Sequence, residues 1–238
     1  GFDLAFVYRH DSVARRQDRD INPRGGRRIY ARYDRMFNWF IQGFDEQNVS
    51  FLQEEYLRLF YNQVTVDWRE FIGLPKNTTL GLRGFGGLIA SDRVNDETVG
   101  DFFDFHLGGL PYMRGYTFYS LEGRKAAMAN ATFRFPLWPA VHRRLGPFYL
   151  DKVYGAVYGD AGKAWDGDIS EHDPVFGRSG PVRDAGLQLR LDLISFYSLP
   201  TRIEFDAAYG FDEVDNKGPW KLYLTVLFNY INWIDPGE

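Results

Sequence analysis

Residues 107–137 read LGGLPYMRGYTFYSLEGRKAAMANATFRFPL, and this stretch decides the fold of the chain. It joins a glycine-rich turn, an arginine that lies between aromatic residues, and a segment in which apolar and polar residues alternate. From Ala127 onward, small or apolar residues occupy the odd positions, while Asn130, Thr132 and Arg134 occupy the even ones. A period of two residues is typical of a strand with one apolar face and one polar face. The stretch therefore predicts a long loop followed by a half-buried strand.

The same alternation recurs along most of the chain. It predicts about nine strands, at residues 2–9, 28–40, 52–74, 79–85, 124–137, 148–165, 185–196, 201–211 and 220–233. Short turns separate some of these strands, and longer loops separate the others. The apolar positions change register within residues 52–74, and we expect a β-bulge near Asn62 because a slip of one residue exchanges the two faces.

Composition excludes several classes of protein. The chain has 238 residues, no cysteine and a formal net charge of -4. The absence of cysteine excludes a disulfide scaffold and thiol catalysis, and the charge balance offers no basic face for nucleic acid. No run reaches the roughly 18 apolar residues that a membrane-spanning helix requires. Tyrosine and tryptophan gather near the ends of the predicted strands, as the interfaces of a transmembrane β-barrel require.

Two motifs resemble a known family. Gly108-Gly109, Met113-Arg114-Gly115-Tyr116 and the strand from Asn130 to Pro136 are similar to the loop and following strand of the bacterial surface antigen family, the BamA- and TamA-type outer-membrane barrels. The family usually has valine or leucine where this chain has Met113. Further along, residues 157–162 (VYGDAG) resemble the strand motif whose aspartate faces the barrel lumen. The two motifs occur in the family's order.

The resemblance implies an all-β fold, a transmembrane antiparallel up-and-down β-barrel. A closed bacterial barrel has an even number of strands, and the family has sixteen. Residues 1–238 would then be the C-terminal portion of a single barrel domain, with about seven strands upstream and a long inward-folded loop at about 88–123. The resemblance also implies a multi-pass protein of the Gram-negative outer membrane, surrounded by its lipid bilayer.

The function that the resemblance implies is non-enzymatic. Such barrels assist the insertion of outer-membrane proteins, or translocate polypeptides, through a lateral seam and a loop-plugged lumen. Expected partners are unfolded outer-membrane or secreted client proteins, together with periplasmic modules or lipoproteins. No cofactor is implied. The alternatives are a passive outer-membrane pore, a structural barrel, and a two-partner-type secretion transporter.

Two groups of residues are candidate functional sites. Arg114, Gly115, Tyr116 and Asp160 form a predicted loop–barrel lock, in which the guanidinium meets the carboxylate away from bulk water. The alternative is an arginine solvated at the tip of a loop. The last strand would form one side of the lateral seam, and its predicted seam residues are Leu222, Leu224, Val226, Phe228 and Tyr230. Ordinary barrel closure by this strand is the competing interpretation.

Other interpretations have less support. The four histidines lack metal-ligand spacing, and no Gly-x-Ser-x-Gly nucleophile motif is present, so we predict neither catalytic residues nor a metal site. Asp166, Asp168, Ser170 and Asp173 outline a calcium loop, but their spacing is not that of an EF-hand. An aromatic-rich soluble β-sandwich would expose charged faces and bury the leucines. Lipid outside and a watery lumen inside account for both faces.

Overall fold

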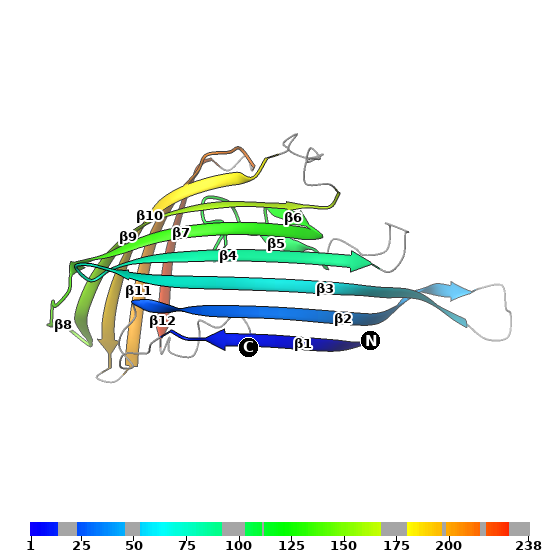
Figure 1. Cartoon of the computed structure of the whole chain (residues 1–238), viewed down its shortest axis with the longest axis horizontal. Helices are drawn as coiled ribbons and strands as arrows, with labels where there is room; N and C mark the ends of the chain where they lie inside the picture. Colours follow the sequence, from blue (N-terminus) through cyan, green and yellow to red (C-terminus); the bar gives the residue numbers. More distant parts are fainter. Residues whose placement is uncertain are drawn as a thin grey trace.

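The computed structural model of the chain is a curved antiparallel sheet with a small hairpin on one face (Figure 1). It describes residues 1–13, 23–45, 53–91, 103–110, 112–167, 180–196, 199–214 and 218–228. The strands are β1 (Phe2–Asp11), β2 (Gly25–Asp45), β3 (Gln53–Leu74), β4 (Thr78–Ser91), β5 (Phe105–Leu107), β6 (Leu121–Gly123), β7 (Lys125–Trp138), β8 (Arg143–Leu145), β9 (Phe148–Trp165), β10 (Val182–Ser195), β11 (Leu199–Gly210) and β12 (Trp220–Phe228). Within these ranges, no helix is long and apolar enough to cross a membrane.

The large sheet follows the order of the chain. Its path is β1-β2-β3-β4-β7-β9-β10-β11-β12, with every neighbouring pair antiparallel, and the short β8 pairs with β9. This up-and-down arrangement of nine long strands confirms the predicted fold class. Among the described strands, β1 and β12 form the two ends of the path and do not pair with each other. The sheet is therefore open, as a part of a barrel wall would be.

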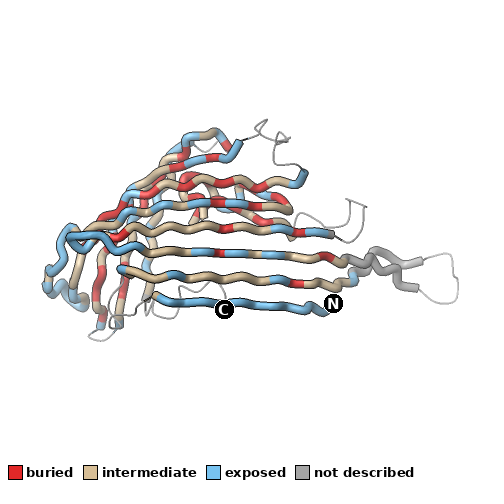
Figure 2. The backbone as a smooth tube through the Cα atoms, in the orientation of Figure 1, coloured by how far each residue is buried: buried red, intermediate tan, exposed pale blue. Residues whose placement is uncertain are grey.

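Burial alternates along the strands of the sheet (Figure 2), and the hairpin of β5 and β6 lies on the face that we call inner (Figure 1). The inner face carries buried polar and charged side chains: Asp34, Asp67, Asp160, Asp184, Gln188, Arg190, Asp192, Arg202 and Asp206. The outer face carries exposed apolar ones: Phe6, Val64, Val66, Trp68, Leu88, Phe133, Val157, Leu187, Leu189, Phe205, Leu222, Leu224 and Val226. This arrangement inverts that of a water-soluble domain, in which charged groups are rarely buried. It suits a wall with lipid outside.

The inner face also carries a row of paired charges on β10 and β11. The guanidinium of Arg190 lies 2.7 Å from the Glu204 carboxylate, which also lies 3.5 Å from Arg202. Arg190 also donates a hydrogen bond of 3.4 Å to the side chain of Gln188. These residues are register partners or neighbours on β10 and β11. Opposite charges placed across adjacent strands stabilise the pairing of those strands.

Two local expectations differ from the structure. The expected bulge near Asn62 is wrong, because β3 pairs with β2 and β4 in unbroken register through that residue. The register shift lies instead in β2, between Ile41 and Gly43. The inner face of β3 becomes apolar at Tyr61 because this ring packs against Phe103 of the loop, at a centroid distance of 5.4 Å. The predicted turn before β9 also contains an additional short strand, β8.

We expect a charge on the outer face to destabilise the folded protein in a bilayer. Leu187 on β10 is 62% exposed, so a soluble protein would tolerate Leu187→Arg with little change. At the middle of a bilayer, the substitution should cost ~2–4 kcal/mol. Urea unfolding of the protein in lipid vesicles measures this cost. The matched control is Phe211→Arg, at an exposed residue that directly follows β11, where the cost should fall to about 0–1 kcal/mol. Equal, small costs at both positions would contradict a lipid-facing outer surface.

Candidate functional site

The segment between β5 and β6 folds into a compact turn with Arg114 at its tip. Gly108 and Gly109 adopt φ values of 113° and 73°, which glycine reaches without strain. The amide of Gly109 donates hydrogen bonds to the carbonyls of Met113 at 2.8 Å and Tyr116 at 3.0 Å. Tyr116 in turn donates its amide to Met113 at 3.2 Å. These backbone hydrogen bonds within the turn define the shape of the tip.

Apolar side chains fix this turn against the inner face. Leu107 and Met113 are fully buried, and they belong to a cluster with Phe85 and Ile89 of β4 and Met128 of β7. Burial of a large apolar side chain stabilises a structure by roughly 1.5–3 kcal/mol. The loop is therefore packed onto the wall as well as bonded to it.

Glycines of the wall make room for this packing. A Cβ added to Gly87 would lie 2.6 Å from the ring of Phe105, and one added to Gly162 would lie 3.1 Å from the sulfur of Met113. Both positions face inward, since Gly87 and Gly162 pair with the buried residues Ala126 and Met128 of β7. The side chains of the loop thus occupy space that larger wall residues would fill.

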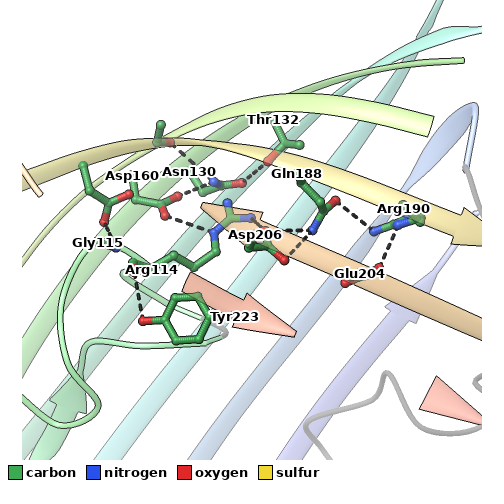
Figure 3. A network of polar contacts seen from close by, with 12 residues as sticks. Arg114, Gly115, Asn130, Thr132, Asp160, Gln188, Arg190, Glu204, Asp206 and Tyr223 are labelled. Carbon is green, nitrogen blue, oxygen red and sulfur yellow. Dashed lines mark hydrogen bonds and ion pairs between the residues drawn. The ribbon is translucent and has the colours of Figure 1, made fainter. Parts of the chain in front are cut away.

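The guanidinium of Arg114 meets three groups of the wall, and two of them, Asp160 and Asp206, are labelled in Figure 3. Its Nε donates to the Oδ2 of Asp160 on β9 at 3.4 Å, and its Nη1 lies 3.5 Å from the Oδ1 of Asp206 on β11. Its Cζ lies 3.2 Å from the ring centroid of Tyr158. The Arg114 side chain is only 12% exposed, and those of Asp160 and Asp206 are 0% and 1% exposed. The structure thus brings together the predicted partners and adds two more.

Neighbouring side chains orient both carboxylates. Asn130 of β7 donates its amide to the Oδ1 of Asp160, and Thr132 donates to the side-chain oxygen of Asn130 at 3.0 Å. Gln188 of β10 donates to Asp206 at 3.0 Å. These bonds fix the directions in which the two carboxylates face Arg114. The carboxylates therefore do not have to reorganise to receive the guanidinium.

The residues next to Arg114 make further contacts with the wall. The amide of Gly115 donates to the Oδ2 of Asp184 on β10 at 3.0 Å. The hydroxyl of Tyr116 donates to the carbonyl of Arg183 at 2.6 Å. A tyrosine hydroxyl is protonated at neutral pH, so it can act as this donor. Gly115 and Tyr116 therefore contact β10, whereas Arg114 reaches β9 and β11.

Tyr223 contacts the tip from β12. Its hydroxyl lies 2.9 Å from the carbonyl oxygen of Arg114 and 3.2 Å from that of Tyr116, and it donates toward both. Its ring meets the ring of Phe118 edge-on, with the centroids 6.1 Å apart. The tip of the loop thus contacts four successive strands, from β9 to β12.

A second contact ties the loop to the opposite part of the sheet. The guanidinium of Arg83 on β4 lies 4.9 Å from the ring centroid of Tyr112, which also packs against Phe85 at 5.0 Å. Arg83 is itself paired with the buried Asp67 of β3 at 2.6 Å, and Arg69 pairs with the same carboxylate at 2.9 Å. The loop therefore bridges β3–β4 and β9–β12 across the inner face.

Sequence reasoning missed several residues of this site: Tyr112, Tyr158, Asp184 and Tyr223, together with the role of Asp206. Alternation places Asp206 on the polar face of its strand, but it does not say which loop residue that face meets. Cross-strand register supplies the missing information, since Asp184 pairs with Asp160, and Asp206 pairs with Tyr223. One signal was available: Asp160, Asp184 and Asp206 lie on the polar faces of consecutive strands, and buried carboxylates favour a cationic partner such as Arg114.

The predicted seam residues lie mainly on the outer face. Leu222, Leu224 and Val226 of β12 are exposed there, opposite Ala207, Phe205 and Ile203 of β11. The backbone of Phe228 pairs with Thr201, and Tyr230 lies outside the described residues. The apolar side chains therefore face the lipid side. The backbone edge of β12 is the part of this strand that would pair at a seam.

The described residues contain no metal-binding group. No three side chains of His, Cys, Asp or Glu are grouped there in a way that would hold an ion. Three of the four residues of the considered calcium loop, Asp168, Ser170 and Asp173, lie outside the described ranges. The buried aspartates around Arg114 are instead used by hydrogen bonds and by the guanidinium itself.

We expect Gly115→Ala to lift the tip of the loop. An added Cβ would lie 2.4 Å from the Cβ of Asp184 and 2.9 Å from the amide nitrogen of Gly210, and the wall backbone cannot move aside easily. Overpacking of this kind costs about 1–3 kcal/mol. Limited trypsin digestion of the folded protein should then cleave after Arg114 faster than in wild type. Gly86→Ala is the matched control, because an added Cβ there meets nothing within 4 Å. Equal digestion of the two variants would contradict the close seating of the tip.

The comparison with protein-family models agrees with this architecture. Residues 2–225 match the model described as the Omp85 superfamily domain. A search of curated proteins found no match. The matched range covers the whole described sheet except the last residues of β12 and includes the loop that carries Arg114. Omp85 proteins are non-enzymatic outer-membrane factors that insert or transport polypeptide substrates. The chain, an open antiparallel barrel wall with an inward loop, belongs to the Omp85 superfamily.

Proposed function

We propose that this chain is the C-terminal portion of a sixteen-stranded BamA- or TamA-type barrel. In this proposal it spans the bacterial outer membrane several times and helps client polypeptides to insert into that membrane or to cross it. Membership of the Omp85 superfamily supports the general role. The observation that carries the proposal is the loop tip, which lies against the inner face and contacts β9 to β12 through buried groups.

In the proposed mechanism, the loop–barrel lock of Arg114, Gly115, Tyr116 and Asp160 keeps the loop across the lumen. Separating Arg114 from its carboxylates would leave buried charges without a partner, at a cost of about 3–5 kcal/mol. An exposed ion pair contributes only about 0–1 kcal/mol. The lock would therefore keep the loop in place in the resting protein, while client strands bind at a different part of the barrel.

The client would be engaged at the edge of β12. An unpaired strand edge presents backbone donors and acceptors that an incoming strand can use, a mode of binding known as β-augmentation. The proposed partner of β12 in the resting barrel is the first upstream strand, and a weak pairing there would form the lateral seam. Unfolded outer-membrane or secreted proteins are the proposed clients, and periplasmic modules or lipoproteins are the proposed accessory partners.

Removal of the guanidinium should open the lumen. We expect the full-length protein in planar bilayers to show a low conductance that rises in Arg114→Ala, because the loop loses its two buried carboxylate partners. Arg183→Ala is the control: its pair with Asp212 is 3.9 Å long, its side chain is 66% exposed, and the conductance should not change. A large, steady conductance that is the same in all three proteins would support a passive pore instead.

Depletion of the protein distinguishes insertion from translocation. Loss of folded outer-membrane proteins, with secretion intact, supports the insertion role. Loss of one secreted polypeptide, with normal outer-membrane proteins, supports a two-partner-type secretion transporter. Normal levels of both would contradict the proposed function.

A further inference from the structure

The last described strand has few contacts that hold it in place. β12 pairs with β11 along one edge, and its other edge meets no described strand. Its outer side chains are largely exposed, Leu222 by 78% and Leu224 by 63%, while Trp220 packs on Tyr209 of β11. Beyond the ladder with β11, the position of β12 therefore depends on what its inner side chains contact.

Tyr223 provides that inner contact. It is the register partner of Asp206, the β11 carboxylate that lies 3.5 Å from Arg114. Its hydroxyl donates toward the carbonyls of Arg114 and Tyr116, and its ring lies against Phe118. Arg114 therefore makes two kinds of contact. Its side chain reaches β9 and β11, while its carbonyl oxygen accepts a hydrogen bond from the Tyr223 hydroxyl (Figure 3).

We infer that Tyr223 is a positioning residue that couples the seating of the loop to the order of β12. Movement of the Arg114 backbone away from the wall would remove the acceptors of the Tyr223 hydroxyl. Release of Tyr223 would likewise remove a donor from the loop tip. Because coupling between two sites is reciprocal, each element should become more mobile when the other is loosened. The consequence for a lateral seam rests on the proposed function, whereas the coupling itself does not.

Tyr223→Phe tests the coupling with the smallest possible change. It removes the hydroxyl and keeps the ring that contacts Phe118. Hydrogen–deuterium exchange of the full-length protein in lipid nanodiscs, without any client, reports on residues 220–228 and on residues 112–118. The net contribution of one hydrogen bond is about 1 kcal/mol, so protected amides in both segments should exchange about five-fold faster than in wild type.

Tyr209→Phe is the matched control. It also removes a tyrosine hydroxyl next to β12, but from the outer face, where the ring of Tyr209 packs on Trp220 at 5.1 Å. Exchange in the loop should not change in this variant. If Tyr209→Phe and Tyr223→Phe accelerate the loop equally, the effect is a general loss of stability and the inference is overturned.

The double variant separates coupling from two independent losses. Arg114→Ala alone should accelerate exchange in β12, although this substitution lies in the loop. Adding Tyr223→Phe to it should produce little further acceleration, because the acceptors have already moved. Multiplicative effects in the double variant, or unchanged β12 exchange in Arg114→Ala, would overturn the inference. Neither result involves client assembly, so the proposed function would stand or fall separately in the depletion experiment.

Discussion

The structure depends on the burial of one positive charge among negative ones. Arg114 is brought by a loop to a wall in which Asp160, Asp184 and Asp206 face inward on three consecutive strands. Carboxylates away from water are costly unless they are paired and hydrogen-bonded. The guanidinium contacts two of them, and the amide of Gly115 contacts the third. The loop therefore adds to the hydrogen bonds that Asp160 and Asp206 already receive from Asn130 and Gln188 of the wall.

The shape of the wall makes this contact possible. Lipid on the outer face removes the need for an apolar interior, so the inner face is available for polar groups and for the loop. Small residues at inward positions, such as Gly87 and Gly162, let the loop approach the strands closely. The apolar contacts of Met113 and Phe105 then stabilise the same position that the charges select. Packing and electrostatics act at one place, which is why a single added methyl at Gly115 is expected to disturb both.

The sequence predicts the strands well and the site in part. Alternation identifies both faces because lipid and lumen impose a strict period of two, and Leu187, Leu189, Gln188 and Arg190 follow it. The pairing of Arg114 with Asp160 was expected only from the resemblance to a family, since the two residues are 46 positions apart. The register of four neighbouring strands places Tyr158, Asp184 and Tyr223 in the site, and no local sequence pattern predicts this register. The bulge predicted near Asn62 illustrates the same limit. The inner face is apolar at Tyr61 because this ring packs against Phe103, and the register does not shift there.

A double-mutant cycle between Arg114→Ala and Asp160→Ala tests the central interaction most directly. The free energy of unfolding of the wild type, the two single variants and the double variant would be measured in lipid vesicles. Arg114→Ala leaves the buried Asp160 without its cation, and Asp160→Ala removes one of the two carboxylates that contact Arg114. The cost of the double variant should therefore be less than the sum of the two single costs, with a coupling energy of about 1–3 kcal/mol. Additive costs, with a coupling energy near zero, would contradict the conclusion that the buried guanidinium and carboxylate hold the loop to the barrel wall.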